Sequence, residues 1–214
     1  MVMFLATFFF LFLSVYLIGY CAVFRRWPAK QRAEAASSFM SLAHGGPAVV
    51  MAVMSFLDSP TATFSAPNSY THRTIFEFCL AYFFVDTIHY FVFFPKNFLF
   101  ILHHFATMFV LITCRYIVFH GAHGLLPLII LAECTSPLQN VWSIAGYRRD
   151  DSPVAARWRN LLSLPFLILY SIVRGLLGPV YVAMLIFFYY GEGGGRVVPA
   201  WASFSWFTVV MVSI

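Results

Sequence analysis

Charged side chains are scarce in this sequence. Only 10% of its 214 residues are Asp, Glu, Lys or Arg, whereas about 25% is usual in a soluble domain. Long apolar runs recur from end to end and leave no stretch of soluble composition between them. Because a helix that crosses a bilayer needs about 20 apolar residues, the composition excludes a separate soluble domain. It predicts one all-α, polytopic membrane protein.

The sequence also lacks cysteine motifs and a basic domain. Its four cysteines lie singly inside apolar runs, which argues against a disulfide framework and against CxxC-type zinc or redox chemistry. The net charge is +5, but the basic residues fall in short loops between apolar runs, where they set membrane orientation. We therefore expect no nucleic acid partner.

Seven apolar runs predict seven transmembrane helices. The first has no basic segment before it and no small-residue cleavage site after it, which indicates a membrane anchor rather than a signal peptide. Stretches with charge, proline or glycine separate the runs. The sixth run holds two prolines and is expected to bend. The runs are roughly Val2–Phe24, Ser37–Leu57, Thr71–Phe94, Phe98–His120, Gly124–Tyr147, Trp158–Tyr190 and Val198–Ile214.

The loop charges predict the orientation of these seven runs. Loops on one side would hold only Arg73 and Arg196, and loops on the other side would hold nine basic residues. Because positive loops stay in the cytoplasm, we expect an external or lumenal N-terminus and a cytoplasmic C-terminus. The nine basic residues are Arg25, Arg26, Lys30, Arg32, Lys96, Arg148, Arg149, Arg157 and Arg159.

Ionisable and amide side chains occur inside the middle runs, where they are costly and usually mark a site. Asp86 and His89 are three residues apart and share one helix face, so the carboxylate can orient the imidazole. His103 and His104 are adjacent and therefore point about 100° apart around a helix. Both can face one pocket only if the pocket lies between the two directions in which they point. The other such residues are His44, Glu77, Arg115, Glu133, Ser136, Gln139, Asn140 and Arg174.

The later polar residues extend the same pattern. Arg115 lies eleven residues after His104, hence on the same face about 16 Å away. Glu133, Ser136 and Asn140 stack on one face, and Pro137 is expected to disturb the helix at the Glu133 carbonyl. Three neighbouring runs thus each carry a polar stripe, and we expect the stripes to converge on one interior cavity.

Structural alternatives exist for these residues. Glu77, Glu133 and Asn140 can join helices by hydrogen bonds without further function. His44 is expected to pack at the membrane interface, and Arg174 can snorkel or pair with an acid. A three-histidine, one-carboxylate metal site is a rival interpretation for Asp86, His89, His103 and His104. Because no H-x-x-x-H or H-x-x-H-H spacing occurs among them, we predict no metal site.

Three segments together resemble a known family. They are Phe84-Val-Asp-Thr-Ile-His-Tyr-Phe, Phe100-Ile-Leu-His-His-Phe-Ala-Thr-Met-Phe and Glu133-Cys-Thr-Ser-Pro-Leu-Gln-Asn-Val-Trp. This combination is similar to the TLC domain, which ceramide synthases and translocation-associated membrane proteins share. The resemblance runs from about Ala35 to the C-terminus. It implies a six-helix barrel over 35–214 around a lipid-sized cavity, usually in the endoplasmic reticulum, with 1–34 as an added anchor.

The resemblance also implies a chemistry. In ceramide synthases the histidine pair is catalytic in acyl transfer from acyl-CoA to a sphingoid amine, which points here to His103 and His104, with Asp86 in support. The chain departs from the synthases where they carry paired aspartates, because it reads Leu131-Ala-Glu-Cys-Thr-Ser-Pro-Leu-Gln-Asn. It is most similar to TLC-domain-containing proteins of uncertain activity.

Two functions therefore remain open from the sequence. In the first, the protein is an acyltransferase whose catalytic residues are His103, His104 and Asp86, with no bound cofactor and with acyl-CoA as a candidate substrate. In the second, it binds a membrane lipid as a sensing, transfer or membrane-composition protein. A small-solute transporter is a further alternative, weakened by the lack of an internal repeat. The expected substrate-binding residues are His89, Arg115, Glu133 and Asn140.

Overall fold

The chain is helical throughout most of its length. The computed structural model describes residues 3–191 and 197–213. Arg196, expected in an outer loop, lies outside these residues. The helices are α1 (Met3–Ile18), α2 (Ala29–Leu57), α3 (Tyr70–Phe93), α4 (Phe98–Ile112), α5 (Ala122–Glu133), α6 (Ser136–Tyr147), α7 (Pro153–Tyr170), α8 (Gly178–Gly191) and α9 (Ala200–Ser213), with π-helical segments η1 (Gly19–Val23), η2 (Thr113–Val118) and η3 (Ser171–Leu177).

Within the described residues, five helical segments are long and apolar enough to cross a membrane. They are Phe4–Val23, Ala29–Leu57, Tyr70–Phe93, Phe98–Val118 and Pro153–Gly191, and Ala200–Val212 is a shorter apolar helix. The prediction of a helical membrane protein is therefore confirmed.

The predicted continuous helix over 124–147 is wrong, because the chain breaks there into α5 and α6. Pro137 lies in the first turn of α6, where its missing N–H costs nothing. Its ring would clash with the Glu133 carbonyl if the helix continued. The break falls at Glu133, as the position of Pro137 predicts.

The sixth run was expected to bend, but its helix is not interrupted at Pro165. That residue lies inside α7 without ending it. The irregularity is instead the π-helical segment η3, which lies directly before the α8 segment that begins Gly178-Pro179. A π-helical turn accommodates a backbone that has lost a donor to proline. This segment carries Arg174.

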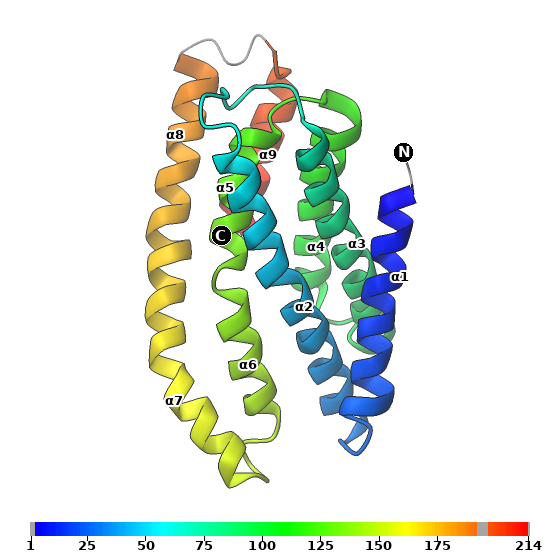
Figure 1. The fold of residues 1–214 in the computed structure, drawn as a ribbon. Helices are drawn as coiled ribbons and strands as arrows, with labels where there is room; N and C mark the ends of the chain where they lie inside the picture. Colours follow the sequence, from blue (N-terminus) through cyan, green and yellow to red (C-terminus); the bar gives the residue numbers. More distant parts are fainter. Residues whose placement is uncertain (1–2, 192–196, 214) are drawn as a thin grey trace.

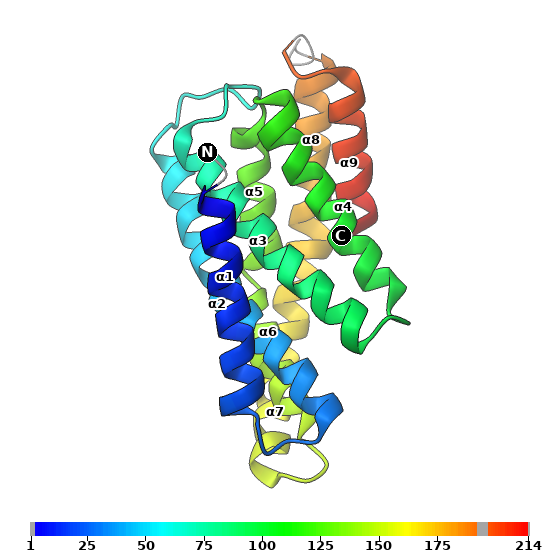
Figure 2. The same ribbon diagram turned by 90° about the vertical axis from the view of Figure 1, so that its right-hand side faces the viewer.

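Helix α3 runs through the middle of the bundle. In its most apolar stretch of 18 residues, 72% of the residues are buried, against 17% in the corresponding stretch of the first helix. Helix α1 nevertheless belongs to the same body, because Phe12 and Tyr16 are buried in the common core and the Phe12 ring packs 4.9 Å from Phe78 of α3. Figure 1 shows α1 along one edge of the bundle and the α7–α8 rod along the opposite edge, and Figure 2 shows α1 in front.

The loops gather at opposite ends of the bundle. Figure 1 shows 24–28 and 148–152 at the lower end and 58–69 at the upper end. At the upper end the loops are tied together: Asn68 Nδ2 donates to the Cys114 carbonyl oxygen at 2.8 Å, and its Oδ1 accepts from Ala122 N at 3.0 Å. Trp206 of α9 donates to Thr113 at 2.8 Å. These contacts fix the ends of the helices that enclose the interior.

Candidate functional site

A cavity of about 450 Å³ lies inside the bundle. Its wall comes from α2, α3, α4, α5, α6, η3, the start of α8 and α9, and mixes aliphatic and aromatic side chains with polar ones. The volume falls within the range of about 300–1,000 Å³ that is usual for ligand sites. Six of the seven residues expected at a site contribute to this wall: Asp86, His89, His103, His104, Glu133 and Asn140.

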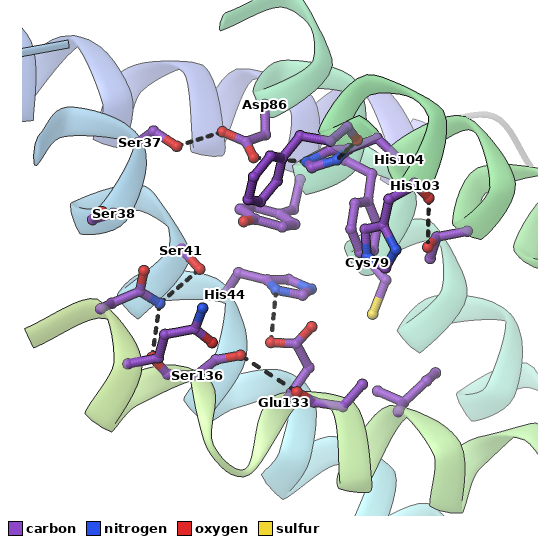
Figure 3. Close-up of a pocket in the computed structure, with 18 of the residues that line it drawn as sticks. Ser37, Ser38, Ser41, His44, Cys79, Asp86, His103, His104, Glu133 and Ser136 are labelled. Atoms are coloured by element: carbon purple, nitrogen blue, oxygen red, sulfur yellow. Dashed lines mark hydrogen bonds and ion pairs between the residues drawn. The ribbon is translucent and has the colours of Figure 1, made fainter. Parts of the chain in front are cut away.

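The centre of the site is an ion pair between α3 and α4. The Nε2 atom of His104 lies 2.7 Å from Oδ2 of Asp86, and both side chains are buried. The hydroxyl of Ser37 on α2 donates to the other carboxylate oxygen at 2.6 Å. The second ring nitrogen of His104 lies 2.7 Å from the Phe100 carbonyl oxygen. Both ring nitrogens of His104 are therefore engaged. Figure 3 shows the contact between His104 and Asp86 and the hydrogen bond from Ser37 to Asp86.

His103 differs from its neighbour. Its ring is 5.9 Å from that of His104 at an angle of 78°, and it lines the same cavity. In the part of the chain that the structure describes, its ring nitrogens form no hydrogen bond, and only its backbone carbonyl accepts one, from Thr107 at 2.9 Å. Both adjacent histidines therefore face the cavity, which lies between the directions in which they point. Of these two histidines, only His103 keeps its ring nitrogens free for a ligand. His44, which also lines the cavity, has no hydrogen bond at its ring nitrogens among the described residues either, but its ring is fully buried and stacks on Tyr82.

The expected pairing of Asp86 with His89 is wrong. Asp86 binds His104 instead, and Nδ1 of His89 lies 2.9 Å from the Tyr16 hydroxyl of α1. His89 also packs among aromatic rings, including Phe93 and Phe94. It therefore joins the N-terminal helix to the wall of the cavity. Within residues 3–191 and 197–213, no group of three metal-ligating side chains is arranged to hold an ion.

His44 was expected at the membrane interface and lies in the interior instead. Its side chain is fully buried, its ring stacks on Tyr82 at 4.0 Å and 6°, and its Nδ1 is 3.7 Å from Oε2 of Glu133. Helix α2 begins at Ala29, eight residues before the predicted start. His44 therefore lies about 22 Å along the helix. Figure 3 shows His44 and Glu133 next to each other in the cavity wall.

The serines of α2 were not among the expected site residues. Ser37, Ser38 and Ser41 line the cavity, and Asn140 Nδ2 donates to Ser41 Oγ and to the Ser136 carbonyl, both at 2.8 Å. Ser37, Ser41 and His44 are spaced i, i+4 and i+7, which places them on one helix face. That spacing was a usable signal in the sequence.

Arg115 does not reach the cavity, which corrects the expectation that it binds substrate there. Its Nη2 donates to Oε1 of Glu77 on α3 at 2.8 Å, and both side chains are 3% exposed. The Tyr116 hydroxyl donates to the same carboxylate oxygen at 3.2 Å. A guanidinium inside an apolar bundle is costly without a counter-charge. Glu77 supplies that charge, so the pair joins η2 to α3.

Comparison with known proteins identifies the family. Residues 34–214 match the TLC domain. The chain is 46% identical over 212 residues to a TLC domain-containing protein of Arabidopsis thaliana, covering 98% of this chain and 84% of that protein. No solved structure matches. The chain therefore belongs to the TLC-domain family of membrane proteins.

Proposed function

We propose that the cavity binds one acyl lipid and that His103 carries out acyl transfer from acyl-CoA inside it. One observation carries the proposal: a free imidazole lies directly beside a fully engaged Asp86–His104 pair, in a cavity wall that combines polar side chains with aliphatic and aromatic ones. Burying an ionisable group in a membrane interior is costly and usually serves function. The aliphatic and aromatic part of the wall suits an acyl chain, and the histidine suits proton transfer.

The proposed reaction needs one base. A neutral His103 accepts the proton of an amine or hydroxyl acceptor as that acceptor attacks the thioester carbonyl carbon. The tetrahedral intermediate then collapses, the bond from carbon to sulfur breaks, and His103 returns the proton to the departing thiolate. His104 cannot take this part, because one of its nitrogens faces the Asp86 carboxylate and the other faces a carbonyl oxygen. The His104–Asp86 pair would act as a fixed charge pair beside the reacting atoms.

A second function follows from a different observation. The site residues largely satisfy one another, since Ser37, His104 and Asp86 form a closed set, and the paired aspartates of ceramide synthases are absent from Leu131–Asn140. A lipid-sensing, transfer or membrane-composition protein would use the same cavity without turnover. The acyltransferase remains the first proposal because it accounts for the free imidazole of His103.

The membrane arrangement is part of the proposal. Helices α5 and α6 have 12 residues each, so together they measure about 36 Å and match a bilayer core of about 30 Å. With α9 as a further crossing helix, the chain would span seven times. Residues 1–34 would then be an anchor, and 35–214 a six-helix barrel. We propose residence in the endoplasmic reticulum, with a lumenal N-terminus and a cytoplasmic C-terminus, from the loop charges.

An enzyme assay tests the reaction. Purified protein in nanodiscs would be given long-chain acyl-CoA together with a panel of long-chain amines and alcohols, and release of CoA would be followed. We expect turnover in the wild type and a loss of about 10²–10⁴-fold in His103→Ala. His120→Ala, a histidine outside the cavity wall, is the matched control. Lipid binding without turnover by any acceptor would overturn the transferase and favour the binding protein.

A further inference from the structure

The cavity wall contains an arginine, Arg174, that forms no ion pair among the described residues. Arg174 lies in η3, 21 residues after Pro153 and 17 before Gly191, hence roughly 25–30 Å from either end of the α7–α8 rod. The rod is longer than a bilayer core of about 30 Å, so its middle would lie near the centre of that core, too deep for an arginine side chain to reach the interface. The Arg174 guanidinium instead contributes to the wall of the cavity.

The carboxylates deep in the bundle lie beside side chains other than Arg174. Glu77 pairs with Arg115, Asp86 pairs with His104, and Glu133 lies 3.7 Å from a ring nitrogen of His44. Glu34, which also lines the cavity, lies five residues from the start of α2. Among the described residues, Arg174 forms no ion pair. No carboxylate of the described residues therefore lies within ion-pair distance of its guanidinium.

The guanidinium is held in place by neutral groups. Its Nη2 donates to the Ala132 carbonyl oxygen at 2.7 Å, near the break between α5 and α6, and its Cζ lies 5.4 Å from the centre of the Tyr170 ring. Its Nε is buried without a partner in the described chain. A guanidinium has five N–H donors, and these contacts use only one of them. The remaining donors at the two terminal nitrogens are available to an oxyanion.

We propose that Arg174 binds the carboxylate of a long-chain fatty acid whose chain occupies the cavity, an inference that rests on the proposed acyl-lipid cavity. A carboxylate matches the planar fork of a guanidinium with two parallel hydrogen bonds. Its single negative charge also cancels the single positive charge of Arg174. A phosphate monoester carries about −1.5 to −2 and would leave excess negative charge in a wall that already holds Asp86 and Glu133.

A ligand series on the wild type tests the charge of the head group. Full-length protein in phosphatidylcholine nanodiscs would be loaded with a fluorescent fatty acid, which is then displaced by oleate, methyl oleate or oleyl phosphate. Each affinity is expressed per mole of ligand dissolved in the membrane, because the three partition differently. We expect oleate to bind about tenfold or more tighter than methyl oleate, and tighter than oleyl phosphate.

Variants test the assignment to Arg174. In Arg174→Gln the preference for oleate over methyl oleate should fall to about twofold or less. Arg174→Lys keeps the positive charge but lacks the planar guanidinium that forms two parallel hydrogen bonds, so it should retain part of the preference for oleate over methyl oleate. Arg149→Gln is the control, because Arg149 pairs with the exposed Asp150 outside the cavity. If Arg174→Gln does not fold, the Arg174→Lys variant and the wild-type ligand series still test whether Arg174 binds a carboxylate.

The outcomes separate this inference from the proposed function. Equal affinity for oleate and methyl oleate in the wild type overturns the carboxylate site but leaves the lipid cavity intact. A preference that persists in Arg174→Gln overturns the assignment to Arg174, and tighter binding of oleyl phosphate overturns the carboxylate in favour of a phosphate. If none of the ligands displaces the probe and the probe itself does not bind, the acyl-lipid cavity fails as well.

Discussion

His104 and Asp86 lie on neighbouring helices, eighteen residues apart, with Nε2 and Oδ2 separated by 2.7 Å in a buried setting. The carboxylate also accepts a hydrogen bond from Ser37 at 2.6 Å. The pair therefore joins α2, α3 and α4 at the level of the cavity. Removing one member leaves the other without its partner, which is usually more costly than losing both.

Asp86→Ala should lower the free energy of unfolding by about 3–5 kcal/mol, the usual cost of breaking a buried ion pair from one side. His104→Ala should also be costly, because it strands the carboxylate. The double variant should cost less than the sum of the two by about 0.5–3 kcal/mol. The midpoint of unfolding in detergent micelles measures all three. Strict additivity would contradict a direct interaction between the two side chains.

Glu77→Gln should destabilise the protein through Arg115. The variant leaves a guanidinium that is 3% exposed facing a neutral amide, and the expected cost is about 3–5 kcal/mol. Asp150→Asn is the matched control, because Asp150 pairs with Arg149 at the surface with 91% of its side chain exposed. Exposed pairs contribute about 0–1 kcal/mol. Similar unfolding midpoints for the two variants would contradict this account.

Much of this architecture could be predicted from local chemistry in the sequence. Long apolar runs and scarce charge predicted a helical membrane protein, and the position of Pro137 predicted the end of α5 at Glu133. The polar residues of the middle runs also led to one cavity, since an ionisable group that is unpaired in a bilayer must face the interior. Each of these inferences depends on residues that are close together in one helix.

The pairing between helices could not be predicted in the same way. Asp86 binds His104 rather than His89, because the rotation of α3 against α4 decides which imidazole reaches it. Arg115 binds Glu77 for the same reason. The face of α2 that carries Ser37, Ser41 and His44 had a readable spacing. It was missed because the predicted helix began too late, which put His44 near an interface.

Gly121→Ala should destabilise the loop that closes the upper end of the bundle. Gly121 has a φ of 92°, and an added Cβ would lie 3.1 Å from the Trp206 ring and 3.2 Å from the Tyr189 hydroxyl oxygen. The left-handed backbone alone costs about 1–2 kcal/mol in a residue with a side chain. Thermal unfolding of the purified protein measures the loss.

Gly46→Ala is the control for that prediction. An added Cβ at Gly46 meets nothing within 4 Å, and the residue lies inside α2. Alanine is a better helix former than glycine by about 1 kcal/mol. The Gly46 variant should therefore be as stable as the wild type or more so. A loss of stability equal to that of Gly121→Ala would contradict the conformational argument.

The proposed orientation predicts which loops a membrane-impermeant thiol reagent reaches. Single cysteines would be placed at Arg149 and at Thr63 in a variant that lacks the native four. In sealed microsomes, Arg149→Cys should react from the cytoplasmic side, and Thr63→Cys should react only after the membrane is permeabilised. The expectation follows from the excess of basic residues in the 148–152 loop and the first turns of α7. Reaction of both positions from the same side would contradict the seven-span arrangement.

The two adjacent histidines should separate activity from stability. His103 has a free imidazole in the cavity, so His103→Ala removes the proposed base and little packing. Turnover should fall by about 10²–10⁴-fold while the unfolding midpoint stays near that of the wild type. His104 is buried between Asp86 and the Phe100 carbonyl. His104→Ala should therefore lower the unfolding midpoint clearly, and its loss of turnover would accompany a loss of folded protein.

His104→Gln refines this test. A glutamine keeps a donor that can reach Asp86, so it should recover part of the stability that His104→Ala loses. His103→Gln should recover no turnover, because an amide cannot accept a proton at neutral pH. Residual acyl transfer, measured per mole of folded protein, is the deciding quantity. If His103→Ala turns over at the wild-type rate and folded His104→Gln does not, the proton acceptor is His104, and the Asp86–His104 pair must open during the reaction.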